Sequence, residues 1–293
     1  MNVNKLTRKE LDILYVLWGT EEALSATKIT EQAPDLNKNT VNALLRKLLR
    51  NGLIRVDDIG YSGTVLTRKY KAVLSHEEYM RQSIEVWEEQ GFEVDAVSTG
   101  YLVSKEQTQL VTDYCKRLKA RGTFIFVDPI MADDGKLYNG ATSDTVEYMR
   151  SVCRVADVIV PNVTEAKFLA GKYLDKDSLT YEEAEDLVMS LQKLGNNSVI
   201  ISSMLMEDQT CTMLYDKSIG KIKVLPYEQV EAQFSGTGDV FSAMTIGHYL
   251  KGNTLEDSVQ TAMDFVAHVI SANRASMHAD NGIPIQNHLG ELM

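Results

Sequence analysis

The sequence has few of the residues that mark metalloproteins, secreted proteins and membrane proteins. Its three cysteines, Cys115, Cys153 and Cys211, lack Cys-x-x-Cys spacing, and its five histidines do not cluster along the chain. This pattern predicts neither a disulfide framework nor a transition-metal site. No apolar run approaches the roughly 18 residues of a membrane span, and the N-terminus has no signal-peptide pattern. The sequence therefore predicts a cytoplasmic protein with no membrane partner.

The composition is that of ordinary globular domains, but the charge is unevenly distributed. Of the 293 residues, 44% are apolar and 24% are charged, and the net charge is −11. Residues 1–80 carry 12 Lys and Arg against 10 Asp and Glu, whereas the other residues carry 18 against 31. This division indicates two halves with different partners, although chance variation between two solvated surfaces would also produce it.

The first half has the order of elements of a winged helix-turn-helix. Two short helical stretches each begin with a hydroxyl residue that can cap the helix, Thr7 and Ser25. A third helix follows within residues 37–54, and its apolar residues fall on one helical stripe. These residues are Val41, Leu44, Leu45, Leu48 and Leu49. Alternating residues then flank a turn from Gly60 to Gly63, as in a two-stranded hairpin.

This half resembles the DNA-binding domain of the BlaI/MecI penicillinase-repressor family over residues 5–82. The stretches that carry the likeness are LTRKELDILYVLWG, LSATKITEQ, NKNTVNALLRKLLRNGLI and SHEEYM. The resemblance implies that the third helix enters the major groove of duplex DNA. The residues expected to face DNA are Lys38, Asn39, Thr40, Asn42 and Arg46. Some winged helices serve instead as protein-protein modules, and the small positive excess of this half is a weak electrostatic footprint.

From residue 94 onward, predicted strands and helices alternate. Four short apolar strands are expected, at 94–100, 123–128, 157–162 and 197–203. Helical segments separate them, which is the pattern of a mostly parallel sheet with helices on both faces. An antiparallel pair of strands and two further helices follow. The predicted fold class is α/β, with a winged-helix domain at 1–82 and an α/β domain at 83–293.

The stretch FSGTGDVFSA combines a glycine-rich turn with an acid at the start of an apolar helix. Such a turn exposes backbone amides beside the positive end of the helix dipole, so Gly236, Thr237 and Gly238 can cradle an anion such as a phosphoryl group. Asp239 can then take a proton from an acceptor hydroxyl. The alternative is an ordinary helix N-terminus whose acid complements the dipole.

The second half resembles the pyridoxal/pyridoxamine kinases of the ribokinase-like superfamily from about residue 84 to the end. Five motifs occur in the order and approximate spacing of that family: TGYLVS, VDPIMADDGKLY, VPNVTEAKFL, FSGTGDVFSA and NGIPIQNHLGEL. The resemblance implies transfer of the ATP γ-phosphate to the hydroxymethyl group of a B6 vitamer, with Mg²⁺ as the cofactor.

Motif by motif, the resemblance also implies roles for single residues. Asp239 would be the catalytic base, and the turn at 236–238 would bind the transferring phosphoryl group. Asp128 and Glu165 would belong to the magnesium and phosphate network. Tyr101 would lie beside the pyridine ring, and the other nucleotide-binding residues would be Asn162, Ser202, Asp133 and Tyr138. Taken alone, Asp128 could simply cap a strand-end loop, and Tyr101 could be a packing aromatic.

The resemblance does not cover the whole kinase pattern. That family begins with a strand, a substrate-binding segment and a lid, and this chain has the winged helix in their place. The sheet would then expose an edge near residues 94–99 unless another element or subunit covers it. Three interpretations remain: a kinase with an altered acceptor side, a transcription regulator whose kinase-derived half senses ATP or a B6 vitamer, and an inactive fusion. Analogy with both families predicts a homodimer.

Overall fold

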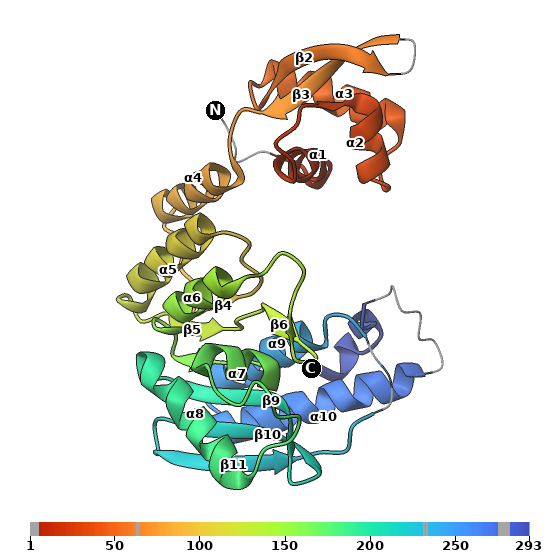
Figure 1. The fold of residues 1–293 in the computed structure, drawn as a ribbon. Coiled ribbons are helices and arrows are strands. Elements are labelled where there is room, and N and C mark those ends of the chain that lie inside the picture. The colour runs from red at the N-terminus through yellow and green to blue at the C-terminus, as the bar shows by residue number, and fades with distance from the viewer. Residues whose placement is uncertain (1–5, 63–64, 231, 233, 275–281, 293) are drawn as a thin grey trace. The chain divides into compact units, whose positions relative to one another are not determined.

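The computed structural model describes residues 6–62, 65–230, 232, 234–274 and 282–292. The chain forms two compact units, an N-terminal unit of residues 1–93 and an α/β unit of residues 94–293 (Figure 1). The boundary predicted between residues 82 and 83 falls inside helix α4 (His76–Glu89), whereas the observed division follows the end of that helix.

The N-terminal unit has the predicted winged helix-turn-helix order. Its helices are α1 (Arg8–Trp18), α2 (Ala26–Gln32), α3 (Lys38–Arg50) and α4, and its strands are β1 (Leu24–Ser25), β2 (Ile54–Ser62) and β3 (Val65–Ala72). The strands form one antiparallel sheet in the order β1-β3-β2. Gly60 is not in the turn as predicted, because it pairs with Thr67 inside a ladder that continues to Ser62. Gly63, the other end of the predicted turn, lies outside the described residues.

The apolar stripe of α3 forms the centre of this unit's core. Val41, Leu45 and Leu48 are at most 1% exposed and are buried together with Ile13 of α1 and Ile29 of α2. Burial of this apolar surface, which stabilises a fold by about 25 cal/mol per Å², is the main force that holds α3 against the other two helices. The polar residues between the stripe positions consequently remain on the outer side of α3.

A buried carboxylate also ties α1 to α3. Glu10 is 1% exposed, accepts hydrogen bonds from the Thr7 amide and hydroxyl at 3.0 and 2.8 Å, and pairs with Lys47 Nζ at 3.0 Å. Burial opposes ionisation, but these hydrogen bonds and the Lys47 charge hold the pKa of Glu10 below its ordinary value. Lys47 therefore serves the fold through this ion pair, although it is exposed like Arg46 and Arg50 on the same helix.

The α/β unit is built on a six-stranded sheet in the order β11-β10-β9-β8-β5-β4. Its parallel strands are β4 (Ala96–Thr99), β5 (Phe124–Val127), β8 (Val158–Ile159) and β9 (Ser198–Met206). The antiparallel strands β10 (Gln209–Asp216) and β11 (Lys221–Pro226) follow at one end, as predicted. A separate small hairpin, β6 (Ala132–Asp133) and β7 (Lys136–Leu137), comes after β5.

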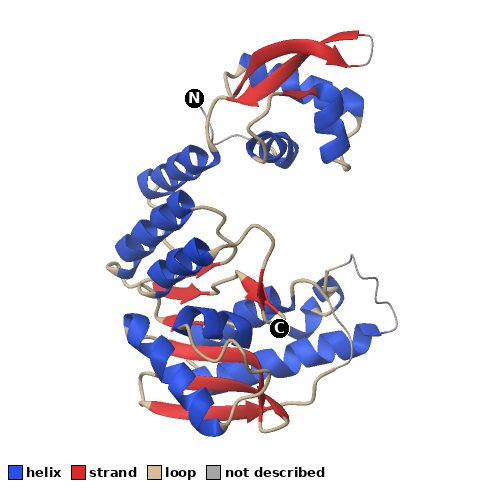
Figure 2. Ribbon diagram, in the orientation of Figure 1, coloured by secondary structure: helices blue, strands red, loops and turns tan. Residues whose placement is uncertain are grey.

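Helices cover both faces of this sheet (Figure 2). One layer contains α5 (Lys105–Lys119), α6 (Ser143–Cys153), α7 (Val163–Ala170) and α8 (Tyr181–Gly195), and the other contains α9 (Thr237–Leu250) and α10 (Leu255–Asn273). Two 3-10 helices, η3 (Ile285–Asn287) and η4 (Leu289–Leu292), follow. On the α9–α10 side, Phe126, Ile200 and Leu214 of the sheet are buried with Leu255 and Val259. No helix in the described ranges is both long and apolar enough to cross a bilayer.

The sheet ends at β4, and the described part of the chain supplies no strand beyond it. On the inner side, the Asp95 carbonyl accepts a hydrogen bond from the Phe124 amide at 2.9 Å. Because alternate residues of a strand face opposite edges, Ala96 and Ser98 direct their backbone groups away from β5. The unpaired edge that the sequence predicts is therefore present in the α/β unit.

Tryptophan and cysteine are divided between the two units. Trp18 and Trp87 are the only tryptophans of the sequence, and both belong to the N-terminal unit. Trp18 stacks on His76 at 4.8 Å between ring centroids and donates its Nε1–H to the Leu74 carbonyl at 2.7 Å. All three cysteines belong to the α/β unit and are fully buried. Burial raises the pKa of Cys115 to about 11, which keeps this thiol protonated and unreactive.

Candidate functional site

The GTGD turn forms the N-terminus of α9. Gly236 is the N-cap residue, and its φ of +85° is a left-handed conformation that favours glycine. The helix begins at Thr237, and no side chain among the described residues caps its first amides. Gly236, Gly238 and Asp239 are all exposed. The turn can thus offer backbone amides to an anion at the positive end of the helix dipole.

Two carboxylates approach this turn from different elements. Asp128 directly follows β5, and its Oδ2 lies 4.0 Å from the position of a Cβ atom placed on Gly238. Oδ2 of Asp239 lies 3.8 Å from the corresponding position on Gly236. Burial raises the pKa of Asp128 to about 7, and the negative charge of Asp239 adds to the shift. A cation bound by Asp128 would offset this repulsion, so the Asp128 carboxylate fits a magnesium ion.

Glu165 fixes the loop that follows Asp128. Its Oε1 accepts hydrogen bonds from the amides of Met131 at 3.0 Å and Ala132 at 3.5 Å, and its Oε2 accepts from Asn162 at 2.9 Å. The Asn162 side chain accepts from the Glu165 amide and donates to the Ala132 carbonyl, at 2.9 and 2.8 Å. Burial raises the pKa of Glu165 to about 8, against the effect of the three amides. Both carboxylate oxygens of Glu165 are thus engaged in hydrogen bonds with backbone amides. Asp128 is the other acid of this network, and its carboxylate lies at the GTGD turn.

A cavity of about 380 Å³ adjoins Asn162. Its wall includes the predicted residue Asp133 and also Ser203, the neighbour of the predicted Ser202. Ser202 forms a backbone bridge with Asn162, whereas Ser203 turns outward with a φ of +56°. No residue of the GTGD turn lines the cavity. The structure therefore presents two neighbouring features, a cavity at the ends of β8 and β9 and an open turn at α9.

Several residues of the cavity wall carry no recognisable sequence signal. Thr210 of β10 and Tyr227 after β11 meet where the Tyr227 amide donates to the Thr210 carbonyl at 3.0 Å. Lys167 and Lys176 bring positive charge to the wall, and Asp177 is also part of it. Burial lowers the pKa of Lys167, and the charge of Asp177 opposes that shift. The only sequence clue to Lys167 is its place in α7, the helix that supplies Glu165 to the acidic network.

The two predicted site tyrosines have different surroundings. The Tyr138 amide donates to the Met131 carbonyl at 2.9 Å. Partial burial raises the pKa of Tyr138, and the charges of Asp133 and Glu165 add to the shift, so this ring belongs to the acidic network. Tyr101 is 53% exposed in the loop after β4. A place for Tyr101 beside a substrate ring stays a prediction.

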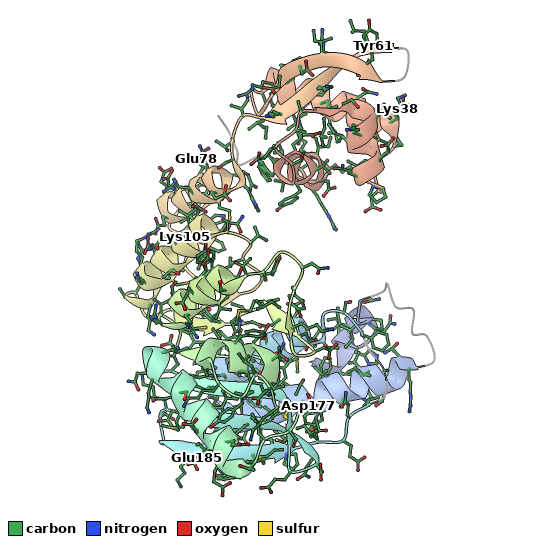
Figure 3. All side chains as sticks on the ribbon, viewed as in Figure 1. Lys38, Tyr61, Glu78, Lys105, Asp177 and Glu185 are labelled. Atoms are coloured by element: carbon green, nitrogen blue, oxygen red, sulfur yellow. The ribbon has the colours of Figure 1, made fainter. Side chains whose placement is uncertain are left out.

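The predicted DNA-facing residues lie along α3. Lys38, Asn39 and Arg46 are exposed, and Figure 3 labels Lys38 at the start of the helix. Thr40 and Asn42 are half-buried, and both make local hydrogen bonds, to the helix cap at 3.1 Å and to the Lys38 carbonyl at 2.9 Å. Thr40 and Asn42 would have to give up these local bonds before they could read a base edge.

Replacing Asp128 by asparagine should stabilise the metal-free α/β unit, more at alkaline than at acidic pH. The pKa of Asp128 is about 7 in the folded protein against an ordinary value of 3.8. The folded state therefore binds more protons between these values, and the cost of the buried charge appears as the pH rises through this range. Asparagine carries no such cost. We therefore expect the melting temperature to rise by about 2–4 °C for each kcal/mol gained in the free energy of unfolding.

Thermal unfolding in EDTA, near pH 5 and near pH 8, measures this effect. Asp208→Asn is the matched control, because Asp208 is an exposed turn residue between β9 and β10. An Asp128→Asn variant no more stable than the wild-type chain at the higher pH would contradict the buried-charge explanation.

Two known protein families match this chain. Residues 67–284 match the family model described as phosphomethylpyrimidine kinase. The chain belongs to this family. Residues 6–120 match the model of the penicillinase repressor, so the kinase relationship is joined to a repressor-type N-terminal domain. The two matches share residues 67–120, which contain most of β3 and all of α4, β4 and α5.

Relatives of the kinase family match about two thirds of their own length. A hydroxymethylpyrimidine/phosphomethylpyrimidine kinase of Aquifex aeolicus is 28% identical over 62% of this chain and 69% of its own. Pyridoxal kinase of Bos taurus is 30% identical over 64% of this chain and 65% of its own. Among solved structures, a candidate phosphomethylpyrimidine kinase of Bacteroides thetaiotaomicron superposes with a TM-score of 0.69 at 28% identity, over 78% of both chains.

Proposed function

We propose that the α/β unit is an ATP-dependent kinase that phosphorylates the hydroxymethyl group of a B6 vitamer. The observation that carries the proposal is the meeting of Asp128, Asp239 and the open GTGD turn beside a cavity, in a chain of the phosphomethylpyrimidine kinase family. The relatives include pyridoxal kinases, and the Bacteroides thetaiotaomicron protein was also solved with pyridoxal. A related fold, pyridoxal kinase of Leishmania donovani, was solved with ADP and pyridoxamine.

In this proposal the nucleotide occupies the cavity, and its terminal phosphate reaches the GTGD turn. Asn162, Asp133 and Ser203 contact the nucleotide, and Lys167 and Lys176 contribute positive charge to the wall. The amides at the start of α9 stabilise charge on the transferring phosphoryl group. Asp239 accepts the proton of the acceptor hydroxyl as the phosphoryl group moves.

Magnesium would be held by Asp128, with Glu165 acting through the loop that it orders. When bound, the ion supplies charge neutralisation between the carboxylates and the phosphates. The Asp128 carboxylate lies at the GTGD turn, with Oδ2 4.0 Å from the Cβ position of Gly238, whereas Glu165 holds Met131 and Ala132 in place. Glu165 is therefore proposed to be a positioning residue for the site.

The acceptor side is less complete than the phosphate side. About a third of each curated relative has no counterpart in the match, and β4 ends the sheet. Tyr101 is the predicted residue nearest this edge in sequence, and it is exposed. We therefore expect slow turnover, because misplacing a reactant by about 1 Å can cost on the order of a hundredfold in rate.

Magnesium-ATP should raise the melting temperature of the wild-type chain but not of Gly238→Leu. A ligand that binds only the folded state stabilises it by about 2.7 kcal/mol at 100 times its Kd. Leucine at position 238 would place bulk over the amides of the turn, since its Cβ lies 4.0 Å from Asp128 Oδ2. Differential scanning fluorimetry with millimolar nucleotide measures the shift.

Gly247→Leu is the matched control for this experiment. Gly247 lies in the same helix, and a Cβ atom there meets nothing within 4 Å. The nucleotide shift should survive in this variant. If magnesium-ATP raised the melting temperature equally in Gly238→Leu and Gly247→Leu, or not at all in the wild-type chain, the GTGD turn would not be part of the nucleotide site.

We also propose that the N-terminal unit binds duplex DNA through α3. The supporting observation is that Lys38, Asn39 and Arg46 are exposed on this helix while its apolar stripe is buried, in a region that matches the penicillinase repressor family. If the α/β unit changes this binding when it takes up ATP or a vitamer, the chain is a regulator as well as a kinase.

A homodimer is part of the same proposal. Two-fold symmetry lets two recognition helices meet successive major grooves of one duplex. The unpaired backbone groups of Ala96 and Ser98 offer one surface where two copies could pair about a two-fold axis.

A further inference from the structure

Two histidines from separate segments meet one carboxylate near the end of the chain. His268 lies in α10, and His288 and Glu291 lie in the 3-10 segment. Their ligating atoms are all within 4.8 Å of one another. His268 Nε2 is 3.1 Å from Glu291 Oε2, and His288 Nδ1 is 2.9 Å from Oε1. The histidines do not cluster along the chain, and only folding brings His268 and His288 together.

Packing fixes one of the two rings. His288 is 8% exposed, and its Nε2 lies 3.0 Å from Nδ2 of Asn273, the last residue of α10. The His268 and His288 rings meet edge to face, with centroids 5.4 Å apart and planes at 89°. One nitrogen of each ring consequently faces the same carboxylate, and the other nitrogen of His288 is occupied by Asn273.

The donor set indicates which ion would suit this cluster. Two imidazole nitrogens and one carboxylate oxygen are the ligands of open zinc sites, and Mg²⁺ and Ca²⁺ prefer oxygen ligands. Tetrahedral zinc with bonds of about 2.0–2.1 Å separates its ligand atoms by roughly 3.3 Å. The nitrogen-to-oxygen distances of 2.9 and 3.1 Å already approach this spacing. The ligand atoms all lie within 4.8 Å of one another, so closing on an ion requires the two rings to approach within that limit.

We propose that His268, His288 and Glu291 bind a divalent transition-metal ion, with Zn²⁺ as the preferred ion. Binding through Nδ1 moves the proton that His288 shares with Glu291 to the other ring nitrogen, without net release. The ring then carries its proton on Nε2, and the Asn273 amide must turn to accept it. That turn gives up the 2.8 Å hydrogen bond from Asn273 to the Val269 carbonyl.

The position of the cluster gives the ion a structural role. The segment that carries His288 and Glu291 begins where Gly282 bridges to Ser235, and the Ile283 amide donates to the Ser235 carbonyl at 2.9 Å. Ser235 immediately precedes the GTGD turn. A metal ion that joins α10 to this segment would therefore hold Gly282 and Ile283 in place against Ser235. This structural role does not depend on whether the GTGD turn serves catalysis.

The test is zinc titration of the full chain, purified without a histidine tag and stripped with EDTA. Competition with a chromophoric chelator gives stoichiometry and affinity, and Co²⁺ substitution gives the visible absorption of a low-coordinate site. We expect one equivalent to bind. His268→Ala and Glu291→Gln should each weaken binding by on the order of 10- to 100-fold or more, since even outer partners of zinc ligands command that range.

Both variants should keep the fold, because the His268 and Glu291 side chains are 55% and 48% exposed. His248→Ala is the matched control, as His248 lies in α9 outside the cluster, and it should bind zinc like the wild-type chain. Equal affinity in the wild-type chain and both ligand variants, or no bound equivalent, would leave the cluster a pair of histidine–glutamate contacts and overturn the proposal.

Discussion

Replacing Asp239 by asparagine is expected to lower the transfer of phosphate from ATP to pyridoxal by about 10²–10⁴-fold, the usual contribution of a general base. Asparagine keeps the shape of the side chain but cannot accept the proton of the hydroxymethyl group. Nucleotide binding should survive, because the turn and the cavity are unchanged. Formation of the phosphorylated vitamer, measured beside the nucleotide-dependent melting shift, separates these two effects.

Asp257→Asn is a close control for this substitution. Asp257 is the third residue of α10, as Asp239 is the third residue of α9, and each is an acid in the first turn of its helix. An acid that merely complements a helix dipole would behave alike at both positions. Equal activity in the two variants would therefore remove Asp239 from the chemistry.

The same assay distinguishes the three interpretations of the chain. Turnover in the wild-type chain that is lost in Asp239→Asn supports the kinase. Absence of turnover, combined with a change in DNA affinity upon addition of ATP or pyridoxal, supports a regulator, since only a ligand that prefers one state can shift the balance. A folded protein with neither response is an inactive fusion.

The double substitution Lys38→Ala and Arg46→Ala is expected to lower the affinity of the chain for duplex DNA and to flatten its salt dependence. Each lost phosphate contact reduces the slope of log affinity against log salt by about 0.9, so the pair should reduce it by about 1.8. Random-sequence duplex is a sufficient probe, because this term does not depend on sequence. Fluorescence anisotropy of labelled DNA over a range of salt concentrations measures it.

Arg81→Ala serves as the control for DNA binding. Arg81 lies on α4 of the same unit and pairs with Glu78 at 3.2 Å, so its removal changes the net charge without touching α3. An unchanged slope in the α3 double variant would mean that another surface contacts DNA. Sedimentation of the complex counts the chains on each duplex, and a single chain per duplex would contradict the proposed homodimer.

Local signals made the elements of this fold predictable. Helix caps such as Thr7 and Ser25 mark helix starts locally, and apolar periodicity distinguishes strands from helices within short windows. The winged helix and the mostly parallel sheet could therefore be predicted from the sequence. The hairpin turn was misplaced because Gly60 fits a turn by propensity, whereas pairing with Thr67 keeps it in the strand.

The site was predictable where a motif is contiguous and not where it is assembled from distant segments. The GTGD turn and Asp128 carry their own patterns. By contrast, Glu165 accepts hydrogen bonds from the amides of Met131 and Ala132, more than 30 residues earlier in the chain. Tyr227 likewise reaches the cavity from beyond β11, where its amide donates to the Thr210 carbonyl. The meeting of His268 with Glu291 likewise depends on how the chain returns to α10.

The segregation of tryptophan and cysteine provides a built-in way to detect communication within the unmodified chain. Fluorescence arises from Trp18 and Trp87 in the N-terminal unit alone, and thiol labelling reports opening of the α/β unit alone, because Cys115, Cys153 and Cys211 are buried there. A nucleotide that slows thiol labelling without altering tryptophan emission acts on one unit only. A nucleotide that changes both signals couples its binding site in the α/β unit to the N-terminal unit. A regulator requires such coupling, and an independent kinase does not.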